Sequence, residues 1–550
     1  MTMPPYGQPP APGSGQPPPP PGYGPPAGYG QQYPGYGQRG YGQPVYGQQY
    51  PGVPPQQPGQ WAQQPPPPPS GSSRALRWGA LGVAGVLSLG LLGGGALFAY
   101  GKINGGGPQP ESALPATAIA FAKVDLDPSV DQKVDAFRFV RKFPGAQDPL
   151  ADIDENADLR RELFDSIKDD GGLEGVDYAR DVEPWLGMRF GVAVLPPADG
   201  AVEPGVVVAL ASTDEDAARR GLSKVTGGSG YCSVQPDFAI CGETKSVVDR
   251  AVSETADSPL ADDDRFTQDM EDLGEDGLVT GWMDATRAKQ QLTGTIGSGV
   301  ATGSEPIGRY AAAIRFDGPT LEIAGRANGL PDGSVPAGDG TAIGELPADT
   351  FAALSISGLD ASIRKAWPQI DKGARETLGD DWQQGVDSFT DETGLSVPDD
   401  VAKAVGSRTT IAVGPDADTT KVALVTNGDR GLIDKLVGAI DSGSAGTSGS
   451  PQLTVKDAGG NRTVVSTDAG YADEVARGSG LAESDAFKDA VPDADKAGTV
   501  GYVDIATAVE LFGEDLDDEE RANLGVLKSA GVAVWGEGDH ADFRFRLTTR

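Results

Sequence analysis

The order of apolar and polar residues divides the chain into three parts. Residues 78–100 form one apolar run in which Ser88 is the only conventionally polar side chain. A helix of this length extends roughly 34 Å, enough to cross the hydrocarbon core of a bilayer. The pattern therefore predicts a transmembrane helix at 78–100, with a polar tail before it and a large mixed domain after it.

Beyond residue 113, the pattern switches repeatedly between the periods of helices and strands. Residues 189–195 run apolar or alternate beside turns, as strands do, whereas Val130, Val134 and Phe137 recur at helical spacing. Hairpins joined by short loops imply antiparallel pairing. We therefore expect an α+β fold in which helices cover one face of an antiparallel sheet.

Several polar residues stand where helices are expected to begin. Ser212 with Glu215 fits a capping box, and Asp429 or Asn427 precedes an apolar helical segment. Asp284 and Asp504 occupy matching places before helical segments. Matched acids of this kind could line equivalent pockets, but their spacing favours helix capping.

The same order of elements occurs twice, which predicts two tandem repeats. LADDDRF from Leu260 corresponds to LAESDAF from Leu481, an offset of 221 residues. The segment that begins at Gly281 corresponds to the one that begins at Gly501, an offset of 220 residues. Near-constant offsets make coincidence a poor explanation. The predicted divisions are a linker at 101–112, a first repeat at 113–330, a linker at 331–344 and a second repeat at 345–550.

The tail, residues 1–73, contains 23 of the 45 prolines and 8 of the 14 tyrosines. Because it lacks Leu, Ile and Phe, it cannot build a core and is expected to be disordered. Arg74 and Arg77 precede the apolar run, and Lys102 follows it. The positive-inside rule places the tail in the cytoplasm and the large domain outside the cell membrane.

Composition narrows the classes of partner. The formal net charge is −35, and only Arg39, Arg74 and Arg77 are charged before the membrane run. This acidity opposes binding to nucleic acid, which carries the same sign. The expected partners are the lipid bilayer, through 78–100, and an envelope protein or ligand.

The two cysteines predict a disulfide. Cys232 and Cys241 are separated by eight residues and lie on the predicted oxidising side of the membrane. The only histidine, His540, is far away in sequence, so a zinc site would lack nitrogen ligands. His540 itself is expected in the turn of the last hairpin.

Catalytic and cofactor motifs are absent from the sequence as written: it contains no nucleophile elbow, Walker loop or H-E-x-x-H. We therefore predict no catalytic and no cofactor-binding residues. The one local pattern that imitates a calcium loop is Asp152, Asp154, Asn156 and Asp158. Ala157 replaces the turn glycine and Leu163 replaces the closing Glu, so an acidic helix start is the favoured interpretation and no metal site is predicted.

The chain resembles bacterial envelope proteins that carry the duplicated domain of unknown function numbered 3352. The resemblance covers roughly residues 113–550. It rests on the Leu-Pro-Ala start at Leu114, the repeated hairpins and the aromatic-x-Asp strands at Trp282 and Tyr502. The Pro/Gly/Tyr/Gln-rich tail is similar to that of actinobacterial members. The resemblance implies architecture and location only, because the family has no established activity.

The expected function is that of a non-enzymatic, single-pass membrane protein. Its acidic extracytoplasmic domain would bind or scaffold a component of the cell envelope. Two alternatives remain: a carrier that holds an apolar ligand between sheet and helices, and an envelope enzyme that depends on carboxylates or a bound cation.

Overall fold

The computed structural model describes residues 107–144, 158–169, 173, 175–227, 230–274, 277–292, 307–331, 342–416, 421–444, 452–478 and 480–550. The predicted tail at 1–73 and the predicted membrane helix at 78–100 lie outside these ranges. Within the described ranges, no helix combines the length and the apolar character needed to span a bilayer. We call residues 107–331 the first half and residues 342–550 the second half.

The first half alternates strands with helices. In chain order its elements are η1 (Pro110–Ala113), β1 (Ala120–Asp125), α2 (Val130–Val140), α4 (Leu159–Asp169), η2 (Tyr178–Val182), β2 (Leu186–Leu195), β3 (Gly205–Ser212), α5 (Glu215–Val225), β4 (Tyr231–Val234), β5 (Phe238–Gly242), α6 (Lys245–Asp257), η3 (Leu260–Asp262), α7 (Asp264–Leu273), β6 (Val279–Asp284), α8 (Ala285–Gln291), β7 (Arg309–Asp317) and β8 (Thr320–Asn328).

The second half follows the same plan with longer helices after its first strand. Its elements are η4 (Ala342–Glu345), β9 (Ala352–Ser357), α9 (Leu359–Leu378), α10 (Asp380–Thr393), α11 (Asp399–Val405), β10 (Arg408–Gly414), β11 (Lys421–Thr426), α12 (Arg430–Ser444), β12 (Thr454–Asp457), β13 (Thr463–Ser466), α13 (Ala469–Arg477), η5 (Leu481–Glu483), α14 (Asp485–Ala490), β14 (Thr499–Asp504), α15 (Ile505–Phe512), η6 (Gly513–Asp515), α16 (Asp518–Leu524), β15 (Leu527–Glu537) and β16 (His540–Thr549).

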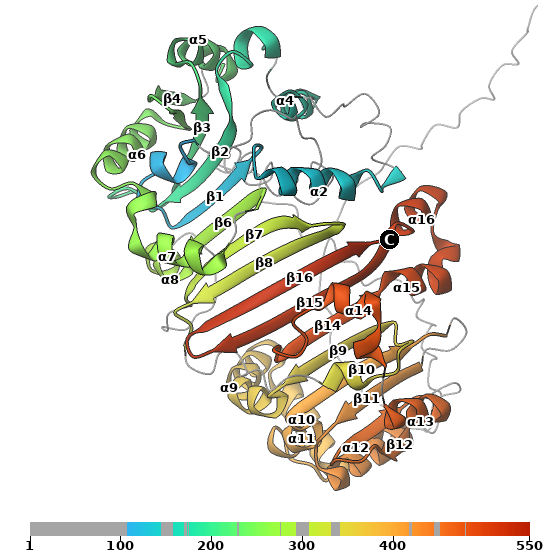
Figure 1. The fold of residues 1–550 in the computed structure, drawn as a ribbon. Coiled ribbons are helices and arrows are strands. Elements are labelled where there is room, and N and C mark those ends of the chain that lie inside the picture. Colours follow the sequence, from blue (N-terminus) through green and yellow to red (C-terminus); the bar gives the residue numbers. More distant parts are fainter. Residues whose placement is uncertain are drawn as a thin grey trace, which may run out of the picture. The chain divides into compact units, whose positions relative to one another are not determined.

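All of these strands join one antiparallel 16-stranded sheet (Figure 1). The order is β12-β13-β11-β10-β9-β14-β15-β16-β8-β7-β6-β1-β2-β3-β5-β4, so the strand order read inward from each outer edge is the same in both halves. We expected two sheets in tandem, and the structure instead joins them. The last strands, β8 and β16, pair from Thr320↔Thr548 to Ala541↔Ala327, so neither is left as an exposed edge.

Helices pack on both faces of the sheet, which corrects the expectation that only one face would be covered. On one face, α7 packs in the first half and α13 and α14 pack in the second; Phe266 with Trp282, and Phe487 with Tyr502, belong to the two cores there. We call this the helix-covered face. The other face is covered only in part, by α2, by α4 with α5, and by α11 with α12.

Most of the predicted helix caps are confirmed. Asp284 accepts a hydrogen bond from the Arg287 amide at the start of α8, and Asp504 does the same for Thr507 at the start of α15. Asp429 accepts from the amide of Leu432 in α12. The capping box at Ser212 was wrong: Asp214 caps α5, because β3 continues through Ser212 before the helix begins.

A candidate binding face

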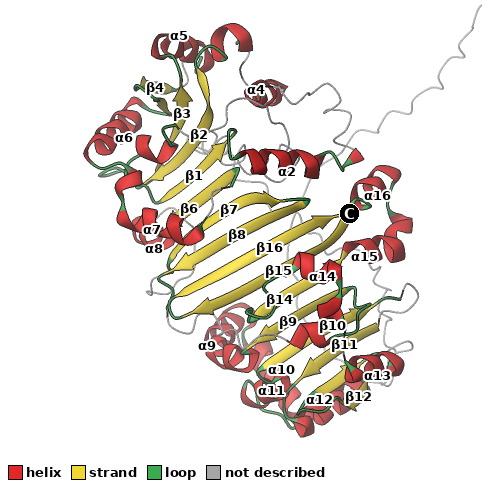
Figure 2. Cartoon of the chain, in the orientation of Figure 1, coloured by secondary structure: helices red, strands yellow, loops and turns green. Residues whose placement is uncertain are grey.

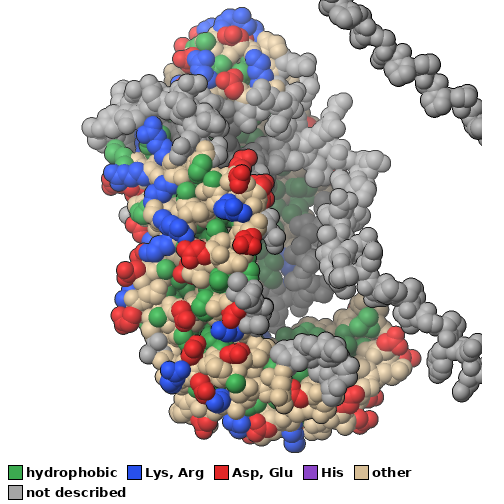
Figure 3. Space-filling view, turned by 90° about the vertical axis from the view of Figure 1, so that its right-hand side faces the viewer, with side chains coloured by type: hydrophobic (Ala, Val, Ile, Leu, Met, Phe, Trp, Pro, Cys, Tyr) green, Lys and Arg blue, Asp and Glu red, His purple; other side chains and the backbone are tan. Residues whose placement is uncertain are grey.

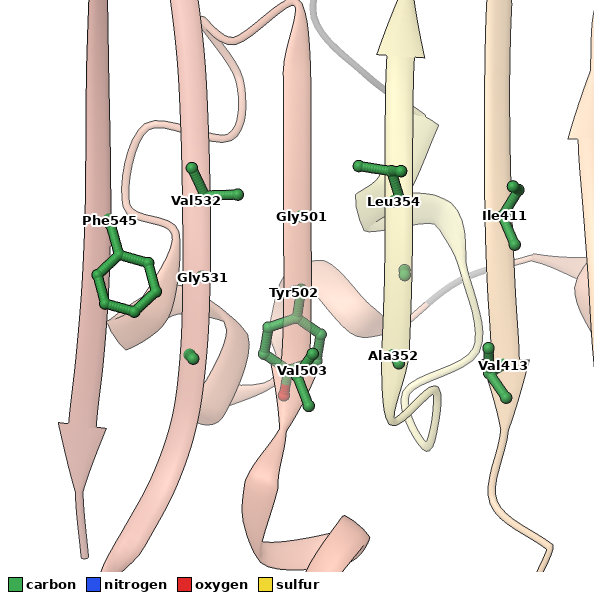
Figure 4. A pocket seen from close by; sticks show the side chains of 12 residues that line it. Ala352, Leu354, Ile411, Val413, Gly501, Tyr502, Val503, Gly531, Val532 and Phe545 are labelled. Atoms are coloured by element: carbon green, nitrogen blue, oxygen red, sulfur yellow. The ribbon is translucent and has the colours of Figure 1, made fainter. Parts of the chain in front are cut away.

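The uncovered part of the sheet carries an apolar surface. We call it the open face and define it by Leu354 on β9, Gly501 on β14 and Val532 on β15. These residues lie in one row across five neighbouring strands, because Phe545 pairs with Val532, Val532 with Gly501, Gly501 with Leu354, and Leu354 with Ile411. Figure 4 shows the row, with the side chains of Val532 and Leu354 on either side of Gly501.

The row borders an open depression of about 340 Å³. Twelve residues line it, and none is charged: Ala352, Ala353, Leu354, Ile411, Val413, Gly501, Tyr502, Val503, Ala530, Gly531, Val532 and Phe545. Leu354, Ile411 and Val503 keep 42%, 44% and 38% of their surface exposed, although all three are apolar. In Figure 3, hydrophobic side chains gather within a hollow of the surface.

Glycine shapes the floor of the depression. A Cβ built on Gly501 would lie 2.9 Å from the Val532 Cγ1 atom, so even alanine would press against this wall. Gly531, one residue before Val532, instead faces the helix-covered side of the sheet. A Cβ built on Gly531 would lie 2.6 Å from the Ala490 carbonyl oxygen. Two glycines on adjacent strands therefore let α14 approach from one side and leave a notch on the other.

Strand β16, at one end of this row, and its neighbours β8 and β7 carry charge on their other face. The buried carboxylate of Glu322 on β8 contacts Arg315 on β7 at 2.7 Å, and Arg546 and Arg544 on β16 at 3.2 and 3.5 Å. Arg326 pairs with Asp542 across the same β8–β16 ladder, and burial raises the pKa of Asp542. In Figure 2 no helix crosses in front of β8 and β16. The middle of the sheet is thus ionic on one face and apolar on the other.

The equivalent row of the first half is made of small residues. The register places Gly325, Ala312, Gly281 and Ala122 where the second half has Phe545, Val532, Gly501 and Leu354. A Cβ on Gly281 would meet only the Phe121 carbonyl oxygen, at 3.8 Å. This stretch is flat where the second half has two walls and a notch. Gly281 and Gly501 correspond along the sequence, and the difference between their rows depends on their cross-strand neighbours.

The structure describes only one residue of the calcium-like pattern, Asp158. Asp152, Asp154 and Asn156 lie outside the described residues. The Asp158 carboxylate accepts from the Arg160 Nε atom at 2.7 Å and from the Tyr178 hydroxyl. Burial opposes its ionisation, but these hydrogen bonds prevail and lower the pKa of Asp158. Asp158 thus starts α4 as an ion-paired acid, and the described residues hold no group of three or more metal-ligating side chains.

The two cysteines form the expected disulfide, with an S–S distance of 2.08 Å. Cys232 on β4 is the direct cross-strand partner of Cys241 on β5, so the bond closes the hairpin at the edge of the sheet. His540 is the first residue of β16, beside the turn of the last hairpin. Neither cysteine is a free thiol, and His540 lies far along the sequence from both.

Comparison with known proteins relates one part of the chain to a family. Residues 80–235 match the model of the family described as "Protein of unknown function (DUF3352)". This part of the chain belongs to the DUF3352 family. The match extends from the predicted membrane run to the end of β4 and confirms the family expected from the sequence. No curated protein and no solved structure matches the chain. The description of the family names no activity.

Proposed function

We propose that the chain is a single-pass membrane protein whose acidic domain lies outside the cytoplasm and binds an apolar component of the cell envelope. The apolar run at 78–100 and the basic residues Arg74 and Arg77 before it support this orientation. The Pro-rich tail at 1–73 would then be a disordered cytoplasmic segment.

The observation that carries the proposal is the contrast between two bare parts of the sheet, one on each face. Where helices leave the middle of the helix-covered face bare, Arg544 and Arg546 form ion pairs with the buried carboxylate of Glu322. On the open face, Leu354, Ile411 and Val503 are exposed instead. Exposed apolar patches of this kind mark binding surfaces. We infer that a partner covers the open face in the cell.

We further propose that the two halves arose from a tandem duplication. The offsets of 221 and 220 residues and the equal strand order of the two halves support it. Under this proposal the copies have diverged: the second kept a notched apolar face, and the first acquired a flat one. Binding would then belong to the second half.

We take the protein to act by binding and not by catalysis. Its two cysteines are joined in a disulfide, and its one histidine begins a surface hairpin strand. A hydrolase activity of the purified protein that a single substitution abolishes would overturn this part of the proposal.

A photoreactive phenylalanine analogue at position 354 of the full-length chain tests the binding face in intact cells. The expected result is a covalent adduct after irradiation. The control is the same analogue at Tyr231, which is 51% exposed on the edge strand β4 and far from the open face in the strand order. Adducts of equal yield at both positions, or none at position 354, would overturn the proposal.

A further inference from the structure

We infer that the depression beside Gly501 holds the acyl chain of a membrane lipid. This inference rests on the proposed function and names its ligand class. It concerns only the second half, where Leu354, Val503 and Val532 surround the notch.

The shape of the depression suits a narrow ligand. Its walls, Val532 and Leu354, flank a floor that has no side chain at Gly501, and Val503 follows two residues further along the same strand. Its volume of about 340 Å³ lies at the lower end of the range for small-molecule sites, about 300–1,000 Å³. A notch one strand wide accommodates an unbranched chain better than a fused ring system.

The chemistry of the lining fits hydrocarbon. Each methylene removed from water contributes about 0.8 kcal/mol, and none of the lining residues carries a charge that would have to be desolvated. The depression is open along one side, so a polar headgroup can remain in water while the chain is bound. The lining offers nothing to pair with a charged group, so specificity for the headgroup is not expected there.

The proposed membrane helix keeps the start of the domain near a source of acyl chains, the bilayer. The described domain begins at Gly107, where a Cβ would lie 2.8 Å from an Nη atom of Arg189 on β2. Arg189 is itself fixed by Asp125 on β1, at 2.9 Å. Seven residue steps separate Tyr100, the end of the predicted membrane run, from Gly107. They span at most about 24 Å when fully extended, so the start of the domain at Gly107 stays within that distance of the bilayer.

Two other occupants fit less well. A second copy would bring together two chains that each carry a formal charge of −35, and this repulsion opposes face-to-face association. The chain's own undescribed segments within the domain are poor in large apolar residues: 145–157 contains only Leu150 and Ile153, and 293–306 only Ile296 and Val300. Their sequences therefore offer few apolar side chains for such a row.

The test uses the full-length protein in phosphatidylethanolamine vesicles that contain a lipid with a diazirine in its acyl chain. Irradiation is expected to label peptides that contain 352–354 and 501–503. Gly501→Leu fills the notch and should reduce this labelling at least tenfold. Gly281→Leu is the matched control in the first half, where the added side chain has room, and should leave labelling unchanged. Thermal unfolding verifies that both variants fold.

A second variant keeps the test independent of the glycine substitution. Val503→Ser makes the 38%-exposed lining residue polar and should weaken labelling several-fold. Labelling that is absent from these peptides, or that persists in Gly501→Leu, overturns the acyl-chain inference.

The photoreactive analogue at position 354 separates the two proposals. An adduct with a protein, a glycan or a second copy of the chain would overturn the acyl-chain inference. A protein adduct would leave the proposed function standing, with a protein as the envelope component on the open face. A glycan, which is not apolar, or a second copy of the chain would overturn the proposed function as well. Absence of any adduct at position 354 would overturn both proposals together.

Discussion

The carboxylate of Asp269 on α7 accepts a hydrogen bond from the indole Nε1 of Trp282 on β6, at 2.8 Å. Asp269 is only 1% exposed. Its carboxylate also accepts hydrogen bonds from the Arg309 Nε atom at 2.7 Å and from the Asn328 side-chain amide at 2.8 Å. This buried network attaches α7 to three strands of the first half. In the second half, the register and the repeat offset place Ala490, Ser529 and Thr548 at the positions of Asp269, Arg309 and Asn328. There, the hydroxyls of Ser529 and Thr548 lie 2.7 Å apart.

Asp269→Ala should destabilise the protein by about 3–5 kcal/mol, because it leaves a largely buried guanidinium and an indole donor without their acceptor. The free energy of unfolding from urea titration measures the loss. The double variant Asp269→Ala with Arg309→Ser copies the second half and should lose less than the sum of its single variants. Strict additivity of the two losses would contradict the network.

The seam between the halves depends on Glu322. This side chain is 6% exposed and faces Arg315, Arg544 and Arg546, so Glu322→Ala should destabilise the seam by about 3 kcal/mol. Amide hydrogen exchange should accelerate most in β8 and β16. Glu322→Gln keeps the shape of the side chain and removes its charge, so a similar effect in both variants would assign the stabilisation to charge. Uniform acceleration throughout the sheet would contradict a local role.

The disulfide should stabilise the edge hairpin. Closing a loop with a sequence separation of 9 contributes about 2–3 kcal/mol in the chain-entropy model, so Cys232→Ala with Cys241→Ala should lower stability by that amount. Val455 and Val465 occupy the equivalent pair in the second half. Valine at both cysteine positions should therefore recover part of the loss by packing under α5. Thermal unfolding with and without reductant measures both effects, and equal melting temperatures for the alanine, valine and native chains would refute the prediction.

Tyr471 on α13 should make stability fall at alkaline pH. Burial raises the pKa of Tyr471 to about 12 in the folded protein, whereas the unfolded chain loses this proton near pH 10. Between these values the unfolded state binds fewer protons, so stability declines as pH rises from about 10 to 12. Tyr471→Phe should make this decline shallower when unfolding is followed across the window. An unchanged slope would show that Tyr471 does not titrate in this way.

The sequence predicted much of the secondary structure because those features depend on neighbouring residues. Asp284, Asp504 and Asp429 cap helices within a few residues of themselves, and the cysteine pair closes a short hairpin. The predicted cap at Ser212 was wrong because β3 continues through Ser212, and Asp214, two residues later, caps α5 instead.

The candidate site could not be predicted in the same way. Gly501 and Gly281 occupy equal places in the two halves and look alike along the chain. Only the pairing of β14 with β9 and β15 puts Leu354 and Val532 beside Gly501. The cross-strand neighbours of Gly281 are instead Ala122 and Ala312. The character of the site is a property of the row across the strands.

By itself, the sequence determined the α+β class, the family, the disulfide and the order of elements in each half, because periodicity, capping and spacing act over short distances along the chain. Only the tertiary structure decided that β8 pairs with β16 in one continuous sheet, that helices cover both faces unequally, and that an apolar row remains open. Strand pairing and helix placement depend on contacts between residues hundreds of positions apart, and the alternation of side chains along one strand does not specify which strand will lie beside it.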